Sequence, residues 1–202
     1  FAVRPAVEDA DPERDRTGRL ALFLAYGFRA TRDRAQALEW VERALQLAPG
    51  NPEARFLRAR LLAEDGRPVT AAGELRKVLA GPPVFLEEVA SVAKSLEADD
   101  AIAVLRRVRE RIPSSGEVRL ALAEALHRAG EYRRAEKEYR DLLRDRPTDR
   151  RVFFGLGRVL LARELYTEAL VAFESAAKQG ESSGEFQADM GQTLMWLGRY
   201  QD

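Results

Sequence analysis

Large and small apolar residues recur along this chain at a helical spacing and again at a longer, nearly constant interval. Five times an alanine is followed four positions later by a large apolar residue, and that spacing places both side chains on one face of a helix. The alanines of this series are Ala37, Ala71, Ala101, Ala135 and Ala169. Their intervals are 34, 30, 34 and 34 residues. A period of this length predicts stacked helical units rather than one closed core.

Two further series keep the same register. Twelve residues before the alanines, and once more at the end of the chain, lie apolar and mostly small residues: Ala25, Ala59, Val89, Ala123, Gly157 and Gly191. Twelve residues after the first four alanines lie prolines: Pro49, Pro83, Pro113 and Pro147. The small residues predict a seam where the two helices of each unit approach closely. The prolines predict the end of each second helix, since proline cannot continue one.

These series resemble the tetratricopeptide repeat family, whose pattern is a large residue, leucine, a small residue, an aromatic, then alanine, an aromatic and proline. The unit that starts at Gly116 shows the pattern well, with Leu122, Ala123, Leu126, Gly130, Ala135, Tyr139 and Pro147. The unit that starts at Arg150 departs from it, because Glu181 stands where the closing proline is expected. The resemblance covers about residues 18–202. It implies an all-α fold, a right-handed α-solenoid of antiparallel helix pairs.

The register divides the chain into a leading segment and six repeats. We expect residues 1–17 to hold an N-terminal extension and the start of the first helix, which Asp11-Pro12-Glu13 would begin and which would end near Ala30. The repeats are then expected at 18–51, 52–81, 82–115, 116–149 and 150–183, with the first helix of a sixth at 184–202.

Turn chemistry predicts where several helices end and begin. Gly66, Gly130 and Gly198 are expected to close first helices in the left-handed conformation. Asn51-Pro52-Glu53 has the cap, first residue and first-turn acid of a new helix. The four residues missing from the third repeat lie between Pro83 and Val89 and amount to about one helical turn. We therefore expect the first helix of that repeat to begin a turn late, near Val84 or Phe85.

The last helix is expected to carry uncovered apolar residues from Leu194 to Leu197. The matching alanine of its second helix would fall one position beyond Asp202. Solenoids usually end in a helix with a polar outer face. We therefore expect the natural protein to continue, and exposed terminal helices would also permit homo-oligomers.

Composition narrows the classes of partner and chemistry. The chain has 33 basic and 33 acidic residues, and this balance argues against a nucleic-acid partner, which would favour a basic stripe. The longest apolar run, Leu20 to Phe28, is too short to insert in a membrane. Cysteine is absent, which leaves both the bacterial cytoplasm and the periplasm open. A bacterial source is suggested by the strong preference for arginine over lysine.

No pattern in the sequence points to catalysis, a cofactor or a metal site. His127 is the single histidine, so a site with several histidines cannot form. Gly155-Leu156-Gly157 is explained by the repeat register rather than by a dinucleotide fingerprint. Asp99-Asp100 is expected in a turn, where acids cap helices. We therefore expect a chain that is not an enzyme and has no cofactor.

The family resemblance implies that the first helices line a concave groove through the second, fifth, ninth and twelfth positions of each repeat. The fifth position is apolar in five repeats, at Leu22, Phe56, Leu86, Leu120 and Phe154. These side chains either form an exposed stripe that marks an interaction site or lie half buried between adjacent first helices. Both alternatives stay open. With residues of the ninth and twelfth positions, the predicted partner-binding groove comprises Leu22, Tyr26, Phe56, Arg60, Leu86, Leu120, Glu124, His127, Phe154 and Arg158.

The leading hypothesis is a protein-interaction scaffold that binds a helix or peptide in this groove. Binding of chaperone C-terminal tails is disfavoured, because no lysine or asparagine occupies the fifth or ninth positions. One alternative is a periplasmic scaffold segment of an exopolysaccharide export or envelope assembly protein. Another is the recruiting segment of an enzyme whose catalytic domain lies elsewhere. An RNA-binding helical repeat fits least, given the zero net charge and the apolar groove positions.

Overall fold

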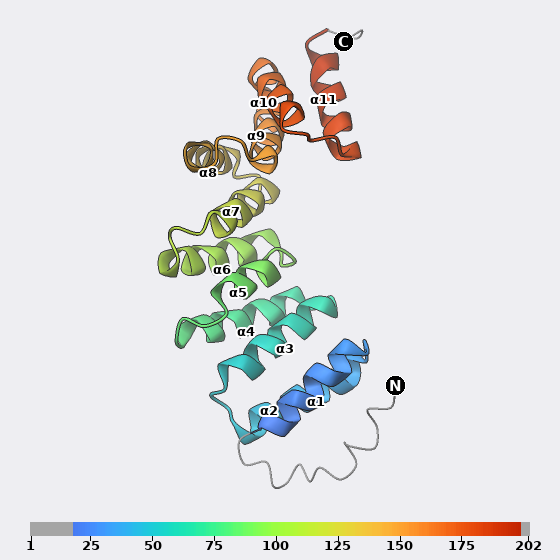
Figure 1. Ribbon diagram of the computed structural model, residues 1–202, viewed down its shortest axis with the longest axis vertical. Coiled ribbons are helices and arrows are strands. Elements are labelled where there is room, and N and C mark those ends of the chain that lie inside the picture. Colours follow the sequence, from blue (N-terminus) through green and yellow to red (C-terminus); the bar gives the residue numbers. More distant parts are fainter. Residues whose placement is uncertain (1–17, 199–202) are drawn as a thin grey trace. The chain divides into compact units, whose positions relative to one another are not determined.

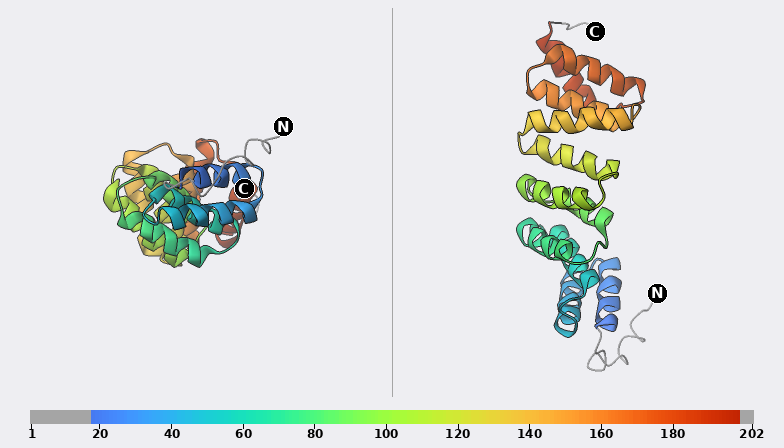
Figure 2. Two further views of the ribbon diagram at one scale, coloured as in Figure 1. Left: turned by 90° about the horizontal axis from the view of Figure 1, so that it is seen from below. Right: turned by 90° about the vertical axis from the view of Figure 1, so that its left-hand side faces the viewer.

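The computed structural model describes residues 18–198, and every regular element among them is an α-helix (Figure 1). These residues fall into two units, one up to Asp100 and one from Ala101. Within each unit, most consecutive helices pack side by side as antiparallel pairs (Figure 2).

The first unit contains α1 (Arg19–Ala30), α2 (Arg34–Leu47), α3 (Pro52–Glu64), α4 (Pro68–Ala80) and α5 (Leu86–Ala93). Helix α6 (Ala98–Arg111) begins at the end of this unit, and most of it belongs to the second unit. The second unit continues with α7 (Gly116–Arg128), α8 (Tyr132–Asp145), α9 (Arg150–Ala162), α10 (Tyr166–Lys178) and α11 (Gly184–Trp196). None of these helices is both long and apolar enough to cross a membrane.

The seam predicted from the small residues lies in the core at every position except the last, Gly191, which is exposed. Ala25, Ala59 and Ala123 have no exposed surface, and Gly157 is also buried. The alanines of the second helices, such as Ala37 and Ala135 of the first series, are equally buried. Small side chains at the seam let the paired helices approach closely enough to pack tightly.

The register also sets where the first helices end. Gly66, Gly130 and Gly198 have left-handed backbones, with φ between 72° and 75°, as predicted. Arg32 and Glu164 occupy the same register position and adopt φ of 63° and 61° without being glycine. A side chain in this conformation costs about 1–2 kcal/mol, so these two residues carry strain that the glycines avoid.

The helix starts agree with the sequence except at the N-terminus and at the second helix of the third repeat. Asn51 caps α3, since its Oδ1 accepts hydrogen bonds from the N–H groups of Glu53 (3.0 Å) and Ala54 (3.2 Å). Helix α1 begins at Arg19 after the left-handed Gly18, which is later than predicted, and Asp11 lies outside the described residues. Asp99 and Asp100 lie in the first turn of α6 rather than in a turn between helices.

The third repeat begins its first helix late, as the four-residue gap predicts. Helix α5 starts at Leu86, directly after Phe85, and has 8 residues where α3 has 13. Phe85 has a left-handed backbone, with φ of 57°, and its ring stacks on Phe56 at 5.4 Å between centroids. This stacking buries the aromatic surface that the shortened helix leaves at its start.

Candidate partner-binding surface

Most of the fifth-position side chains are packing residues. Leu22, Phe56, Leu86 and Leu120 are at most 9% exposed, and only Phe154 is half buried. These five side chains therefore do not form an exposed apolar stripe, and the alternative that they pack between helices describes them better. These buried side chains support the surface from beneath but leave little accessible area for a partner to contact.

Phe154 joins an aromatic cluster in the second unit. Its ring meets Phe173 of α10 at 6.1 Å and Phe186 of α11 at 5.9 Å, the latter edge to face. The guanidinium of Arg158 lies 5.6 Å from the centre of the Phe154 ring, at cation–π distance. Phe154 therefore contacts the buried Phe173 ring and the Arg158 guanidinium at the same time.

Outside the third repeat, where Ala90 and Ala93 are buried, the ninth- and twelfth-position residues are more exposed. In each unit they share a surface that we call the groove face. In the first unit Tyr26 is 37% exposed and donates a hydrogen bond from its hydroxyl to Oε1 of Glu53 (3.2 Å). Burial and the nearby Glu53 carboxylate raise the pKa of Tyr26 to about 12. The phenol therefore stays protonated and keeps this hydrogen bond at neutral pH.

Two arginines share one carboxylate on the groove face of the first unit. Glu64 accepts from Arg29 at 2.8 Å and from Arg60 at 3.2 Å. Burial alone would raise the pKa of Glu64, but the hydrogen bonds and charges of both arginines outweigh it and lower that pKa. Arg60 and Glu64 also line a pocket of about 230 Å³ between α3 and α5, whose other wall carries Glu88, Ser91 and Ser95.

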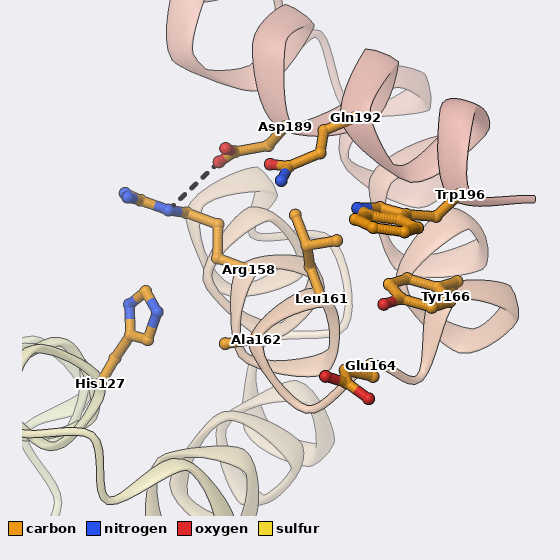
Figure 3. A pocket seen from close by; sticks show the side chains of 9 residues that line it. All are labelled: His127, Arg158, Leu161, Ala162, Glu164, Tyr166, Asp189, Gln192 and Trp196. Atoms are coloured by element: carbon orange, nitrogen blue, oxygen red, sulfur yellow. Dashed lines mark ion pairs between the residues drawn. The ribbon is translucent and has the colours of Figure 1, made fainter.

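A larger pocket, of about 350 Å³, lies on the groove face of the second unit (Figure 3). Its lining comes from α7, α9 and α11, which are successive first helices, and from the start of α10. Four of the residues stand at the ninth or twelfth positions, namely His127, Arg158, Leu161 and Gln192. The remaining lining residues are Ala162, Glu164, Tyr166, Asp189 and Trp196.

The positive charge in this pocket is already paired. Arg158 lies 3.2 Å from Oδ2 of Asp189 and 3.5 Å from Oε2 of Glu185, both on α11. Burial raises the pKa of Asp189, and the neighbouring Arg158 only partly offsets this. Burial also lowers the pKa of His127, and Arg158 adds repulsion, so the imidazole is neutral at pH 7.

The other end of the pocket combines aromatic rings with an acid. The rings of Tyr166 and Trp196 stack at 5.7 Å with an angle of 13°, and Trp196 remains 57% exposed. Glu164, which has the left-handed backbone, lines the same pocket as this ring pair (Figure 3). Leu161 separates this aromatic end from Arg158.

The structure brings together some of the predicted site residues. His127 and Arg158 share the pocket of the second unit, with Phe154 beneath Arg158. Phe56 and Arg60 share the pocket of the first unit. Glu124 is half buried on α7 and lines neither of these pockets.

Sequence reasoning missed Glu164, Tyr166, Asp189 and Trp196. A signal for Trp196 was present, because it stands at the register position of Glu64 and Ala162, and both of these line groove-face pockets. A signal for Glu164 was also present, because it replaces the glycine that closes other first helices. Within residues 18–198, no three His, Asp or Glu side chains gather as metal ligands would.

Comparison with known proteins agrees with the repeat architecture. Two sequence models described as tetratricopeptide repeat match residues 23–83 and 97–153, which together make up more than half of the chain. A search of curated protein sequences found no match.

Among solved structures, MamA has a TM-score of 0.69 at 19% identity, with 81% of this chain and 92% of MamA covered. A tetratricopeptide repeat protein from Parabacteroides merdae has the same TM-score at 18% identity and covers 94% and 75%. YrrB has a TM-score of 0.68 at 18% identity and covers 96% and 98%. The chain belongs to the tetratricopeptide repeat family.

Proposed function

We propose that this chain is a protein-interaction scaffold whose main binding site is the pocket on the groove face of the second unit. The observation that carries the proposal is the lining of that pocket. Side chains from three successive first helices line it together. Four of them stand at the ninth or twelfth positions, which are not the seam positions of the repeat. Such positions can vary without loss of the fold, so their residues are available for recognition.

The shape and chemistry of the pocket suit a peptide segment of a partner. It is open, and it places an apolar side chain, Leu161, between the charged Arg158 and the exposed ring of Trp196. An extended or helical segment can insert one or two anchor side chains there while its backbone crosses the helices. YrrB, which is similar in fold, is described as a tetratricopeptide repeat protein with an unusual peptide-binding site.

The proposal extends to the groove face of the first unit as a secondary contact. Tyr26 and Arg60 are partly exposed there, beside a smaller pocket. The buried fifth-position residues Leu22, Phe56, Leu86 and Leu120 act as support for these contacts rather than as anchors. Phe154 has the same role beneath Arg158.

Selection of peptides on the intact chain, followed by matched variants, tests the proposal. A phage-displayed library of random peptides is selected on the full chain, and the dissociation constants of the enriched peptides are measured. Gln192→Arg places a bulky charge in the pocket from an exposed position on α11. We expect it to weaken binding about tenfold or more, which is the loss typical of disturbing a central contact.

Val171→Arg is the matched control, because Val171 is 59% exposed on α10 and does not line this pocket. We expect it to leave the dissociation constants unchanged, with circular dichroism confirming that both variants fold. Equal effects of the two substitutions, or no effect of Gln192→Arg, would show that the pocket is not the binding site.

A further inference from the structure

We infer that the aromatic end of the pocket in the second unit receives a basic side chain, lysine or arginine, from the bound segment. The inference rests on the proposed function and names the chemistry of its anchor. It depends on three features of the pocket: the pairing of its charges, the exposed ring pair and the backbone of Glu164.

The pairing of charges leaves an unmatched acid. Arg158 is engaged by both Asp189 and Glu185, and its guanidinium also lies over Phe154. His127 is neutral and adds no positive charge. Glu164 is exposed and has no ion pair among the described residues. An acidic ligand would therefore have to displace two carboxylates from Arg158, whereas a basic ligand meets a carboxylate that needs no rearrangement.

The ring pair offers a second, independent attraction for a cation. Tyr166 and Trp196 are nearly parallel, so the Tyr166 ring covers one face of the indole, while the 57% exposure of Trp196 leaves the rest of the indole surface open to a cation. A guanidinium or ammonium over an indole face is attracted by the negative potential of the ring, and arginine also stacks on it. Leu161 provides an apolar surface for the aliphatic stem of the same side chain.

The left-handed backbone of Glu164 is strained, so placing an acid at this position costs stability. Its register position holds glycine at Gly66, Gly130 and Gly198, where the left-handed turn is unstrained. A strained residue beside a pocket is the kind of feature that binding sites retain. Arg32 has the same strain in the first unit, which makes it a control for strain without the acidic charge.

Capped tripeptides of sequence Ala-X-Ala provide the test, with X as arginine, norleucine or glutamate. The chain has two tryptophans, so a Trp40→Phe variant leaves Trp196 as the fluorescent reporter at the pocket. We expect the arginine tripeptide to bind about three- to tenfold more tightly than the norleucine tripeptide, as one cation–π contact and one exposed ion pair would give. We expect the glutamate tripeptide to bind most weakly.

Glu164→Gln removes the charge and should reduce the preference for arginine over norleucine to the part that the cation–π contact with the ring pair supplies. Glu174→Gln makes the same change at an exposed glutamate of α10 outside the pocket and should preserve the preference. Glu164→Gly should reduce the preference to the same extent while raising thermal stability, whereas Arg32→Gly should raise stability and leave the preference intact.

The outcomes separate this inference from the proposed function. Equal binding of arginine and norleucine, tighter binding of glutamate, or an unchanged preference in Glu164→Gln would overturn the inference. The proposed function would survive if display-selected peptides still lost affinity in Gln192→Arg. If the dissociation constants of the tripeptides and of the selected peptides were all unchanged in the pocket variants, both the inference and the proposed function would be overturned.

Discussion

The groove faces of the two units carry opposite arrangements of charge, and the ninth position, Arg60 in one and Arg158 in the other, is common to both. In the first unit two guanidiniums, from Arg29 and Arg60, share the carboxylate of Glu64. In the second unit two carboxylates, from Asp189 and Glu185, share the guanidinium of Arg158. The helices that carry these groups occupy equivalent places in their repeats. The scaffold therefore fixes where side chains stand on this face but leaves their charge free.

The seams of the two units also differ, and here the difference follows from packing. In the first unit the seam residues are Ala25 and Ala59, opposite a register position filled by Val41 and Leu75. In the second unit that opposite position holds the larger Tyr139 and Phe173, both buried. A Cβ on Gly157 would lie 2.5 Å from the Phe173 ring, and one on Gly155 would lie 2.4 Å from the Tyr139 ring. The Phe173 ring therefore leaves no space for a Cβ at the seam residue Gly157, and the Tyr139 ring leaves none at Gly155 of the following repeat, whereas the seam residue in the register of Tyr139 is Ala123.

The largest expected effect comes from adding a methyl group to the glycine seam. Gly157→Ala should destabilise the second unit by about 2 kcal/mol, because the Phe173 ring is held in a packed core and cannot retreat freely. Urea unfolding followed by circular dichroism measures this loss. Gly191→Ala is the matched control, since it has the same register position on α11 and no heavy atom within 4 Å of its Cβ among the described residues.

That control should stabilise α11 by up to about 1 kcal/mol, because alanine is the better helix former. Changes of opposite sign in the free energy of unfolding for Gly157→Ala and Gly191→Ala would support the packing explanation of the glycine seam. Two stabilising results would show that the Phe173 ring gives way and that the seam is not close packed.

The next largest effect concerns the strained turns, one in each unit. Glu164→Gly and Arg32→Gly should each raise the free energy of unfolding by about 1 kcal/mol, because glycine relieves the left-handed strain. Equilibrium denaturation of the single variants and of the double variant checks both the size and the additivity. A loss of stability in either variant would mean that its side chain makes a compensating contact that outweighs the strain.

A smaller effect is expected from neutralising the shared acids. Glu64→Gln should cost the first unit about 0.5 kcal/mol, since both arginines then lose their charged partner on a partly exposed surface. Asp189→Asn should be close to neutral, because burial already disfavours its charge and Arg158 keeps Glu185. If Asp189→Asn lowered the free energy of unfolding more than Glu64→Gln does, the proposed difference between the two charge arrangements would be contradicted.

The smallest effect is a difference in acid titration. The lowered pKa of Glu64 means that its contribution to stability is present above its unfolded pKa and is lost as pH falls through the folded value. The raised pKa of Asp189 has the opposite sign, because the native state binds this proton more readily and gains relative stability as pH falls. Carbon-detected NMR of the side-chain carboxyl groups should give a higher midpoint for Asp189 than for Glu64, and the reverse order would contradict both assignments.

Periodicity predicted the fold well because packing constrains it. The close seam requires small residues at Ala25, Ala59, Ala123 and Gly157, and every one of them is buried. The late start of α5 followed from counting residues, because a loss of one helical turn preserves the helix face. The start of α1 was missed because Asp11-Pro12-Glu13 has the features of a helix start, whereas Gly18 with its left-handed backbone precedes the observed helix.

The candidate site was only partly predictable. Register placed His127 and Arg158 on one face, and the structure shows both lining one pocket. Register could not show that most fifth-position residues are buried, since burial depends on how closely neighbouring repeats pack. Glu164 and Tyr166 lie in a turn and at a helix start, where the family pattern assigns no binding role. Their meeting with Trp196 depends on contacts between repeats, which no single repeat encodes.

Site-specific photo-crosslinking tests the central claim most directly. A benzoylphenylalanine placed at Gln192 lies in the pocket of the second unit, and one placed at Val171 lies on an exposed part of α10 outside it. With the tightest display-selected peptide, we predict crosslinks from position 192 and none above background from position 171. Crosslinks mainly from position 171, or none from position 192, would contradict the assignment of this pocket as the partner-binding site.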